Sequence, residues 1–366
     1  MVYFRRMKQL IDRIQKNKHR LATFALIIGF AVDIVTFRNL NLAYAQIILA
    51  VHLFIVATAI LILATPVREK TNSFFAHVRS WTPVAHQYST GNLLSAFLVL
   101  YSASGSFAQS WLFFALLAVA ILGNERLTLQ KYRLPFHTSL FFLNVLLFMA
   151  LALPVVTRSI SAASFLGAVV VATIIFQIFR RVLRFVAKEA YAHNRKRIHQ
   201  SGVVVLVALV VLYFTNLIPP IPLTLKHINF YHSVERSGDA YLVRDETRGI
   251  FESFFDSGGK TLRLVLGEDA YVFTAVSAPA QLNTNVVHRW EYFDEANERW
   301  VTKNTVQFSI TGGRHDGYRG FSLTEDPAVG KWRVSVETAR GQVIGRAKVI
   351  VERANTQAIL SSVKVF

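Results

Sequence analysis

The stretch NLIPPIP, residues Asn216–Pro222, marks the point where the pattern of the chain changes. Consecutive prolines cannot continue a helix, so an apolar helix over 202–221 is expected to end here. Before this stretch long apolar runs dominate, and after it apolar and polar residues alternate with a period of two. These patterns are typical of helices and of strands, respectively. The sequence therefore predicts a membrane all-α helical bundle followed by an all-β domain.

The first half contains enough apolar sequence for about seven transmembrane helices within 21–223. The candidate spans are 21–37, 42–65, 92–107, 110–123, 138–156, 162–179 and 202–221. A spanning helix needs about 20 apolar residues, so the third and fourth segments are short. They are separated by SASGS at Ser102–Ser106, which predicts a tight helical hairpin, with a re-entrant pair as the alternative.

Basic residues are concentrated between alternate apolar runs. Segments 1–20, 66–91, 124–137 and 180–201 together hold 20 Lys and Arg, whereas the other connections hold two, Arg38 and Arg158. The positive-inside rule then places the N-terminus in the cytoplasm and, after seven crossings, everything beyond about Leu223 outside it. Residues 1–200 hold 22 Lys and Arg against five Asp and Glu, which is 17 of the 18 net positive charges. This concentration between apolar runs is typical of a membrane protein and argues against a nucleic-acid partner.

The start of the chain allows two interpretations. A basic region, an apolar run and AYA at Ala43–Ala45 imitate a cleaved signal peptide. However, a full span follows AYA directly, so we expect no cleavage. Residues 1–20 are expected to form a cytoplasmic basic amphipathic segment against the anionic inner leaflet, with a solvated lead-in as the alternative. The residues expected to contact the lipid are Arg5, Arg6, Lys8, Arg13, Arg180, Arg181 and Arg184. The last three begin the basic stretch Arg180–Arg197, which we expect to continue the sixth helix.

The strand-rich half predicts an all-β Ig-like sandwich. Trp332, Val334 and Val336 alternate with polar residues, and the run turns at Ala339–Gln342 and returns through Val343–Val351 as a hairpin. Short strands of this spacing indicate an antiparallel sandwich, expected over 268–353. Residues 224–267 are expected to be a strand-rich juxtamembrane lead-in, and 354–366 a tail.

The glycine-rich stretch GGRHDGYRG, Gly312–Gly320, follows a predicted strand over 305–311 and precedes a short one over 321–324. A phosphate-binding loop of the Walker type needs a Lys-Ser/Thr ending and a following helix, and neither is present. The stretch is therefore expected to be a structural turn. The alternative is a recognition loop in which Arg314, Tyr318 and Arg319 contact a ligand or partner.

Other polar residues give few signs of chemistry. The chain has no cysteine, and His227, His232 and His315 lack metal-site spacing, so no metal, cofactor or catalytic residue is predicted. His288 alternates with tryptophan and tyrosine and is expected to be a hydrogen-bonded core histidine. Polar residues within the apolar segments are candidates for a membrane site by default: Asp33, Asn92, Asn144 and Gln177. None of the helices is expected to carry a polar stripe.

The second half resembles a known family, the bacterial domain of unknown function 2914. The similar stretches are VVHRWEYFD (Val286–Asp294), VQFSITGGRHDGYRGFS (Val306–Ser322), GKWRVSVET (Gly330–Thr338) and GQVIGRAKVIV (Gly341–Val351). The junction LYFTNLIPPIPL (Leu212–Leu223) with YHSVER (Tyr231–Arg236) is similar to multi-span members. The resemblance implies a bacterial inner-membrane protein with a periplasmic Ig-like module, and it implies no activity or ligand.

These observations predict a multi-pass inner-membrane protein that presents a periplasmic β-sandwich as a binding or assembly module of the cell envelope. Its partner would be an envelope protein or glycan. The alternative is a membrane-embedded enzyme or transporter with its site in the helical bundle.

Overall fold

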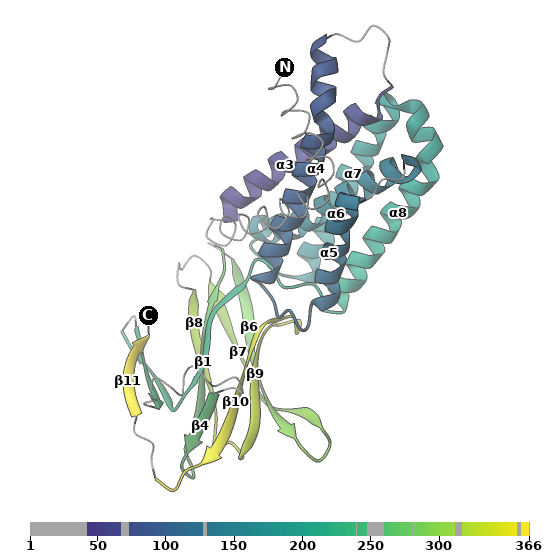
Figure 1. Ribbon diagram of the computed structural model, residues 1–366. Coiled ribbons are helices and arrows are strands. Elements are labelled where there is room, and N and C mark those ends of the chain that lie inside the picture. The colour runs from purple at the N-terminus through teal and green to yellow at the C-terminus, as the bar shows by residue number, and fades with distance from the viewer. Residues whose placement is uncertain are drawn as a thin grey trace, which may run out of the picture. The chain divides into compact units, whose positions relative to one another are not determined.

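The computed structural model describes residues 42–66, 73–126, 130–238, 240–246, 260–279, 282–311, 317–356 and 360–365 (Figure 1). The chain divides into two compact units. The helical unit comprises the chain up to Leu100, Leu112–Ala152 and Gly167–Val211. The β-rich unit comprises Tyr101–Trp111, Leu153–Leu166 and the chain from Leu212 onward, so the main division lies just before the proline stretch.

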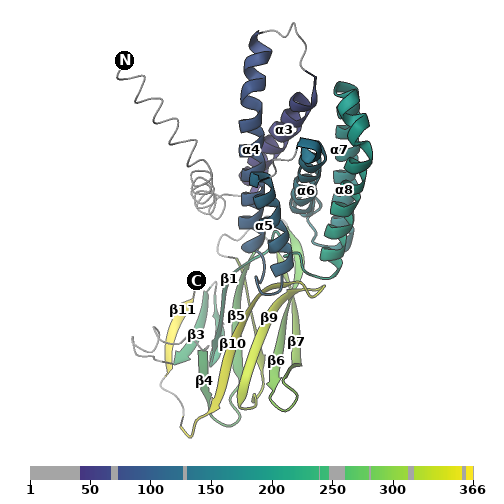
Figure 2. The same ribbon diagram turned by 45° about the vertical axis from the view of Figure 1, so that its right-hand side comes forward.

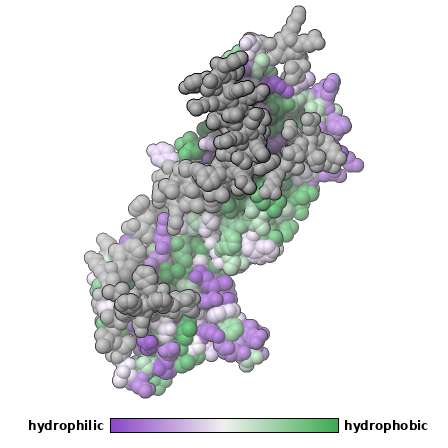
Figure 3. All heavy atoms as spheres, viewed as in Figure 1, coloured by the Kyte–Doolittle hydropathy of each residue, from purple (hydrophilic) through white to green (hydrophobic). Residues whose placement is uncertain are grey.

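Six helices precede the strands in the described part of the chain: α3 (Leu42–Ala64), α4 (Ser73–Ser102), α5 (Trp111–Arg126), α6 (Gln130–Thr157), α7 (Ala162–Val186) and α8 (Lys188–Phe214). Four are long and apolar enough to cross a membrane, namely α3, the Leu134–Thr157 part of α6, α7 and α8. Large apolar side chains such as Phe54, Ile174 and Val204 are more than half exposed on them. Where residues are coloured in Figure 3, the middle of the helical part is apolar and its upper right end is hydrophilic, and the strands show a mixture. An apolar exposed surface of this kind suits contact with lipid.

The predicted number of spans is wrong for the described residues, which were expected to hold six and hold four. The difference lies in the two short segments. α4 begins at Ser73 and has a polar first half, and α5 has 16 residues, fewer than the roughly 20 that a span needs. The helix break predicted at Ser102 is confirmed, since α4 ends there. The predicted span 21–37 and the amphipathic segment lie outside the described residues.

The basic stretch Arg180–Arg197 does not continue one helix. α7 ends at Val186 and α8 starts at Lys188, so basic residues lie on both sides of a turn at Ala187. The two helices run back along each other: Arg180 Nη2 donates to the Tyr191 hydroxyl (3.2 Å), and a Cβ on Gly202 would lie 3.0 Å from Phe176. The turn therefore forms a basic end of a helical hairpin.

The strands of the β-rich unit form three sheets (Figure 2). The first has the order β1 (Thr224–Tyr231), β5 (Ala270–Ser277), β8 (Tyr318–Thr324). The second has the order β4 (Lys260–Leu264), β10 (Val343–Arg353), β9 (Gly330–Thr338), β6 (Asn283–Asp294), β7 (Arg299–Thr311). The third is small, with the order β11 (Leu360–Val365), β3 (Ala240–Glu246), β2 (Ser233–Ser237).

Segments that the sequence set apart from the sandwich belong to these sheets. β1 and β4, from the predicted lead-in, pair with β5 and β10, and the β4–β10 pairing is parallel. β11, from the predicted tail, pairs with β3. The lead-in and the tail therefore supply strands to these sheets. A local sequence pattern does not indicate this pairing, because the partners lie about 40 to 120 residues away.

The first two sheets share a core. Phe230 and Val272 of the first sheet pack in one buried cluster with Trp290, Trp332 and Val334 of the second. The predicted alternation is confirmed in β9, where Trp332, Val334 and Val336 are buried. The predicted β9–β10 hairpin is also confirmed, and Gly341 in its turn has φ +83°. The architecture is thus helices followed by a β-rich region of several sheets, and the Ig-like sandwich stays a prediction.

Residues of two connections, the one that follows α8 and the one between α6 and α7, contact strands within the β-rich unit. The side chain of Gln342 donates from Nε2 to the carbonyl of Ile218 (3.1 Å), and Asn216 Nδ2 donates to the carbonyl of Arg340 (3.1 Å). Ile160, from the α6–α7 connection, packs on the second core cluster of the strands. The β9–β10 turn is therefore fastened to the proline stretch that ends α8.

Candidate functional site

Only part of the glycine-rich stretch lies among the described residues. Gly312–Asp316, including Arg314, lie outside them, whereas Tyr318 and Arg319 open β8 and pair with β5. The ring of Tyr318 packs against the second core cluster. Gly317 has φ +89°, and a Cβ there would lie 3.0 Å from the carbonyl carbon of Val276. The described end of this stretch is thus shaped by backbone and core, and its role in recognition stays a prediction.

A dense set of charged residues lies on the five-stranded sheet. We define the charged face as seven residues of β6, β9 and β10: Arg289, Glu291, Arg333, Ser335, Glu337, Arg346 and Lys348. They alternate along their strands with core residues such as Trp290 and Val334. Because successive side chains of a strand point to opposite sides, the charged face lies on the side away from the core.

Two bidentate ion pairs cross the strands of the charged face. Arg333 donates from Nε and Nη2 to the two carboxylate oxygens of Glu291, at 2.7 and 2.9 Å. Arg289 donates from Nε and Nη2 to Oε2 of Glu337, at 3.0 and 2.9 Å. Glu291 and Glu337 are 8% and 5% exposed, so the arginine side chains cover them. Such charge-assisted pairs are geometrically specific and fix the position of both groups.

Ser335 lies at the centre of the charged face and is fully buried. Its hydroxyl accepts a hydrogen bond from Nε of Arg346 (2.8 Å) and donates to Oε2 of Glu291 (3.3 Å). The hydroxyl is therefore fixed between a cation and an anion. Since no imidazole belongs to the seven residues, this geometry suits binding of a charged group better than activation of a nucleophile.

The ionisation of these groups follows from their partners. Burial raises the pKa of Glu291, but the hydrogen bond and charge of Arg333, then the charge of Arg346 and the hydrogen bond of Ser335, together more than offset this, so that the net direction is downward. The hydrogen bond to Glu337 raises the pKa of Arg289. Burial, and then the positive charge of Arg333, lower the pKa of Arg346, whereas the charges of Glu291 and Glu337 raise it by less. Burial beside Arg333 thus disfavours the charged form of Arg346.

Aromatic residues flank the charged face. The guanidinium of Arg333 lies 4.3 Å from the ring centroid of Trp300 on β7, and the Trp300 ring is 5.1 Å from that of Phe293. Cation–π contact adds to the ion pair in holding Arg333. Arginine and tryptophan are also the residue types enriched at binding hot spots.

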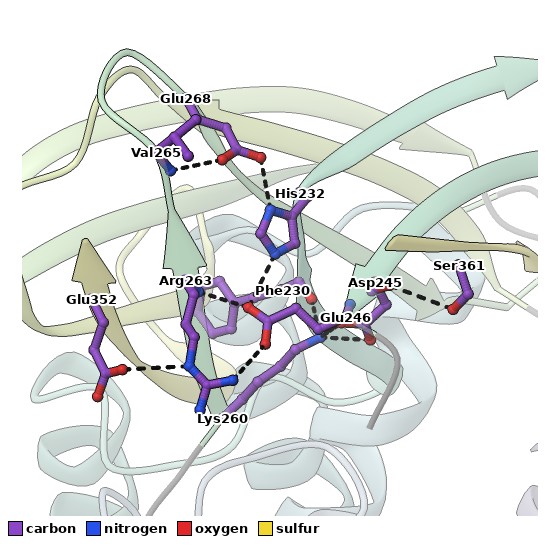
Figure 4. A network of polar contacts seen from close by, with 10 residues as sticks. All are labelled: Phe230, His232, Asp245, Glu246, Lys260, Arg263, Val265, Glu268, Glu352 and Ser361. Carbon is purple, nitrogen blue, oxygen red and sulfur yellow. Dashed lines mark hydrogen bonds and ion pairs between the residues drawn. The ribbon is translucent and has the colours of Figure 1, made fainter. Parts of the chain in front are cut away.

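A second polar cluster surrounds His232, between β1 and β2 (Figure 4). The ring is almost completely buried, and both of its nitrogens face carboxylate oxygens: Nδ1 lies 2.7 Å from Glu268 Oε1 and Nε2 lies 3.2 Å from Glu246 Oε1. Each carboxylate also accepts a backbone N–H, Glu246 from Arg263 (2.7 Å) and Glu268 from Val265 (3.0 Å). This His232 cluster connects the small sheet to the strands of the other two.

Lys260 extends this cluster. Its ammonium group donates to the carbonyl of Phe230 and to Asp245 (2.7 Å), and lies 4.8 Å from the ring centroid of Tyr231. Burial, and then the charge of Lys260, lower the pKa of the nearby His227. In the described residues no group of histidines and carboxylates is arranged to hold a metal ion. The described contacts of this cluster thus cross-link strands.

His288 is a hydrogen-bonded core histidine, as the sequence predicted, and is fully buried. Thr274 donates from Oγ1 to the carbonyl of Gly320 (3.2 Å), so its oxygen accepts from Nε2 of His288 (3.0 Å). Trp290 can only donate and gives its Nε1–H to Ser322 Oγ (2.9 Å). Ser322 then donates its own hydrogen to Nδ1 of His288 (2.9 Å). In this series of hydrogen bonds every donor has an acceptor, which fixes the His288 ring as the neutral Nε2–H tautomer.

Among the polar residues predicted in the membrane segments, Asn144 and Gln177 make hydrogen bonds within their own helices. Asn144 on α6 is buried and donates to the carbonyl of Leu140 (2.9 Å). Gln177 on α7 accepts a hydrogen bond from Arg180 (3.1 Å). Asn92 lies half-buried on α4, and Asp33 is outside the described residues. The described hydrogen bonds of Asn144 and Gln177 do not join them into one site.

The helical unit does contain a polar stripe that the sequence analysis missed. Thr82, His86, Ser89 and Thr90 lie on one face of α4 and are all at most 5% exposed. The ring of His86 meets His137 of α6 edge to face at 4.4 Å. The signal was present as helical spacing in residues 82–90, but this segment was assigned to a loop. Its local polarity hid a helix that tertiary packing forms.

Comparison with known families matches one region of the chain. Residues 283–351 match the model of a family described as Protein of unknown function (DUF2914). The chain carries a DUF2914 domain. Its residues include β6 to β9 and most of β10, and all seven residues of the charged face lie within it. The His232 cluster lies outside the DUF2914 domain, so the charged face is the site that belongs to the matched region itself.

Other comparisons add no argument to the DUF2914 match. A search of the curated proteins found no significant match. Among solved structures, the chain is similar to Pseudomonas fluorescens alkylpurine DNA glycosylase AlkC bound to DNA containing an abasic site analog. That likeness has 10% identity and covers 82% of this chain and 97% of that chain, with a TM-score of 0.21. A likeness this weak carries no conclusion about fold or binding.

Proposed function

We propose that the chain is a multi-pass protein of the bacterial inner membrane that holds its β-rich unit in the periplasm as a binding or assembly module of the cell envelope. The proposal includes an Ig-like sandwich formed by the first two sheets, which the core shared by Phe230 and Trp290 supports. The charged face of the DUF2914 domain is its binding surface, and an envelope protein or glycan is the partner class.

One observation carries the topology. The connections 101–111 and 153–166 and the chain from 212 onward all belong to the β-rich unit. They hold one Lys or Arg before the proline stretch, namely Arg158, whereas the basic residues gather at other connections such as the α7–α8 turn. The positive-inside rule therefore supports a periplasmic β-rich unit and a cytoplasmic turn at Ala187. Arg180, Arg181 and Arg184 would then contact the anionic inner leaflet.

Single cysteines test this topology. The chain has no cysteine, so a Leu266→Cys or Glu189→Cys variant carries one labelling site without background. Both positions are exposed in the structure. A membrane-impermeant maleimide should label the Leu266→Cys variant in intact spheroplasts, and it should label the Glu189→Cys variant only after lysis. The opposite pattern would mean an inverted protein, and labelling of both variants in intact spheroplasts would mean that α8 does not cross.

A second candidate function has one observation in its favour, the polar stripe on α4. Burying polar side chains is costly unless they find polar partners, so a buried polar stripe is a candidate site. A site for transport or catalysis in the helical unit would then include His86. Replacement by His86→Leu should abolish complementation of a deletion strain at normal protein level, whereas Tyr88→Leu, at a 66% exposed position of the same helix, should complement. Full complementation by both variants would exclude this candidate.

A further inference from the structure

The charged face carries more positive charge than its own carboxylates balance. Arg289, Arg333, Arg346 and Lys348 supply four positive charges, and Glu291 and Glu337 supply two negative ones, which leaves a surplus of two. The two carboxylates are already engaged by Arg333 and Arg289. The surplus therefore rests on Arg346 and Lys348, for which no ion pair is found within the described part of the chain.

The positions of these cations are unfavourable for the isolated sheet. Lys348 on β10 lies directly opposite Arg333 on β9, and like charges directly opposite each other destabilise a sheet. Arg346 is half-buried and lies opposite Ser335, two residues along β10 from Lys348 and on the same face. Burial, and then the charge of Arg333, lower the pKa of Arg346, and the nearby carboxylates of Glu291 and Glu337 offset this only in part. Local rules broken in this way are expected at functional sites.

We propose that the charged face binds a phosphate group between Arg346, Lys348 and Arg333. A phosphate monoester carries close to two negative charges at neutral pH, which matches the surplus. The Nη atoms of arginine suit bidentate contact with phosphate oxygens, and lysine adds a point charge. The Trp300 ring and Glu291 hold Arg333 in place beforehand, so that little ordering is needed on binding. This inference rests on the proposed binding function and names its ligand chemistry.

Calorimetric titration of the full chain with inorganic phosphate tests the proposal. The protein is kept in a non-ionic detergent, at constant ionic strength with chloride as the balancing anion. The double variant Arg346→Gln/Lys348→Gln should bind phosphate at least about tenfold more weakly than the wild type. The control double variant Lys226→Gln/Arg236→Gln removes the same net charge at exposed positions of β1 and β2, and it should bind like the wild type.

Thermal unfolding of both double variants without phosphate completes the test. The Arg346→Gln/Lys348→Gln protein should be at least as stable as the control, because the change relieves repulsion; if it does not fold, Lys348→Gln alone at its exposed position serves as the variant. Equal weakening in both double variants, or no phosphate binding by the wild type, would overturn the proposal.

The source of the phosphate is resolved by adding phosphatidic acid, a lipid that carries a phosphate monoester, to the micelles. If the added lipid weakens the binding of inorganic phosphate to the wild type, the ligand is a lipid headgroup. If phosphate binding is unchanged, the ligand is a soluble phosphorylated molecule. Cysteine labelling remains an independent measurement of topology, so failure of phosphate binding with the expected labelling would remove the ligand class and leave the membrane arrangement.

Discussion

Gly320 on β8 lies against the ring of Phe308 on β7, so closely that a Cβ on Gly320 would be 2.6 Å from Cε2 of that ring. The backbone of Gly320 does not have a positive φ, so glycine is required here for space and not for conformation. Gly320→Ala should therefore lower the melting temperature of the β-rich unit, with a cost of about 1–3 kcal/mol from overpacking. Tryptophan fluorescence during thermal unfolding of the full chain measures this.

A second substitution separates this cause from a general effect of alanine. In Gly320→Ala/Phe308→Leu the smaller side chain leaves room for the new methyl group, so the cost of the double variant should be less than the sum of the two single costs. Additive costs would show that the clash with Phe308 is not the reason for the glycine.

Gly317, three residues earlier, should respond differently. Its φ of +89° and the nearby carbonyl carbon of Val276 both disfavour a Cβ. Gly317→Ala should cost on the order of 1 kcal/mol or more. Because this strain lies in the backbone, Phe308→Leu should not relieve it. By contrast, Arg319→Gln should change the free energy of unfolding by less than about 1 kcal/mol, and a larger loss would give Arg319 a structural role.

His288 should make the β-rich unit less stable in acid. Burial lowers the pKa of His288 to about 3, whereas the unfolded ring titrates at 6.5. Below pH 6.5 the unfolded chain gains a proton that the folded ring does not accept. The contribution of the neutral His288 ring to the free energy of unfolding is therefore complete above pH 6.5. It declines as the pH falls towards 3, by at most about 1.4 kcal/mol per pH unit.

The tautomer gives a direct measurement of the same site. Nitrogen NMR of the protein with labelled histidine should show His288 as the neutral Nε2–H form between about pH 7 and 5. A ring that takes up a proton near its ordinary pKa in the folded protein would contradict the hydrogen-bond order deduced from Trp290, Ser322 and Thr274.

Loss of one carboxylate from the His232 cluster should loosen the small sheet. Glu246→Gln replaces the carboxylate that faces Nε2 of His232 and accepts the N–H of Arg263, so we expect a cost of about 1–3 kcal/mol. Hydrogen exchange should then quicken in β3. Glu235→Gln is the matched control in the same sheet, because its pair with Arg244 is exposed and 3.8 Å long, and such pairs contribute little. Equal exchange in the two variants would show that the cluster does not hold the sheet.

The sequence predicted features that depend on local pattern. Alternation located Trp332, Val334 and Val336 in the core, and the prolines located the end of the last helix near Asn216. It did not predict that polar residues on the opposite side of β9 would be buried as well. Glu337 is covered by Arg289 of β6, which lies 48 residues away in the sequence, and Ser335 is covered by Arg346 across the β9–β10 hairpin.

The same limit explains the other errors. His232 meets Glu246 and Glu268 through three separate segments, and no spacing in the chain indicates their meeting. The polar face of α4 was visible as helical spacing around His86. The segment was nevertheless predicted to be a loop, because it has too few apolar residues for a membrane span. Tertiary contacts, such as that between His86 and His137, decide such helices.

The order of the strands has a consequence for anyone who would excise the DUF2914 domain. A fragment of residues 283–351 would retain β6 to β9 and most of β10, but it would lack β4 and β5, the neighbours of β10 and β8. It would also lose Phe230, Leu262 and Val272 from beneath Trp290. The unpaired edges of β8 and β10 and the exposed core would favour aggregation of such a fragment. The boundary recognised by family comparison is thus narrower than the boundary within which this polypeptide can fold.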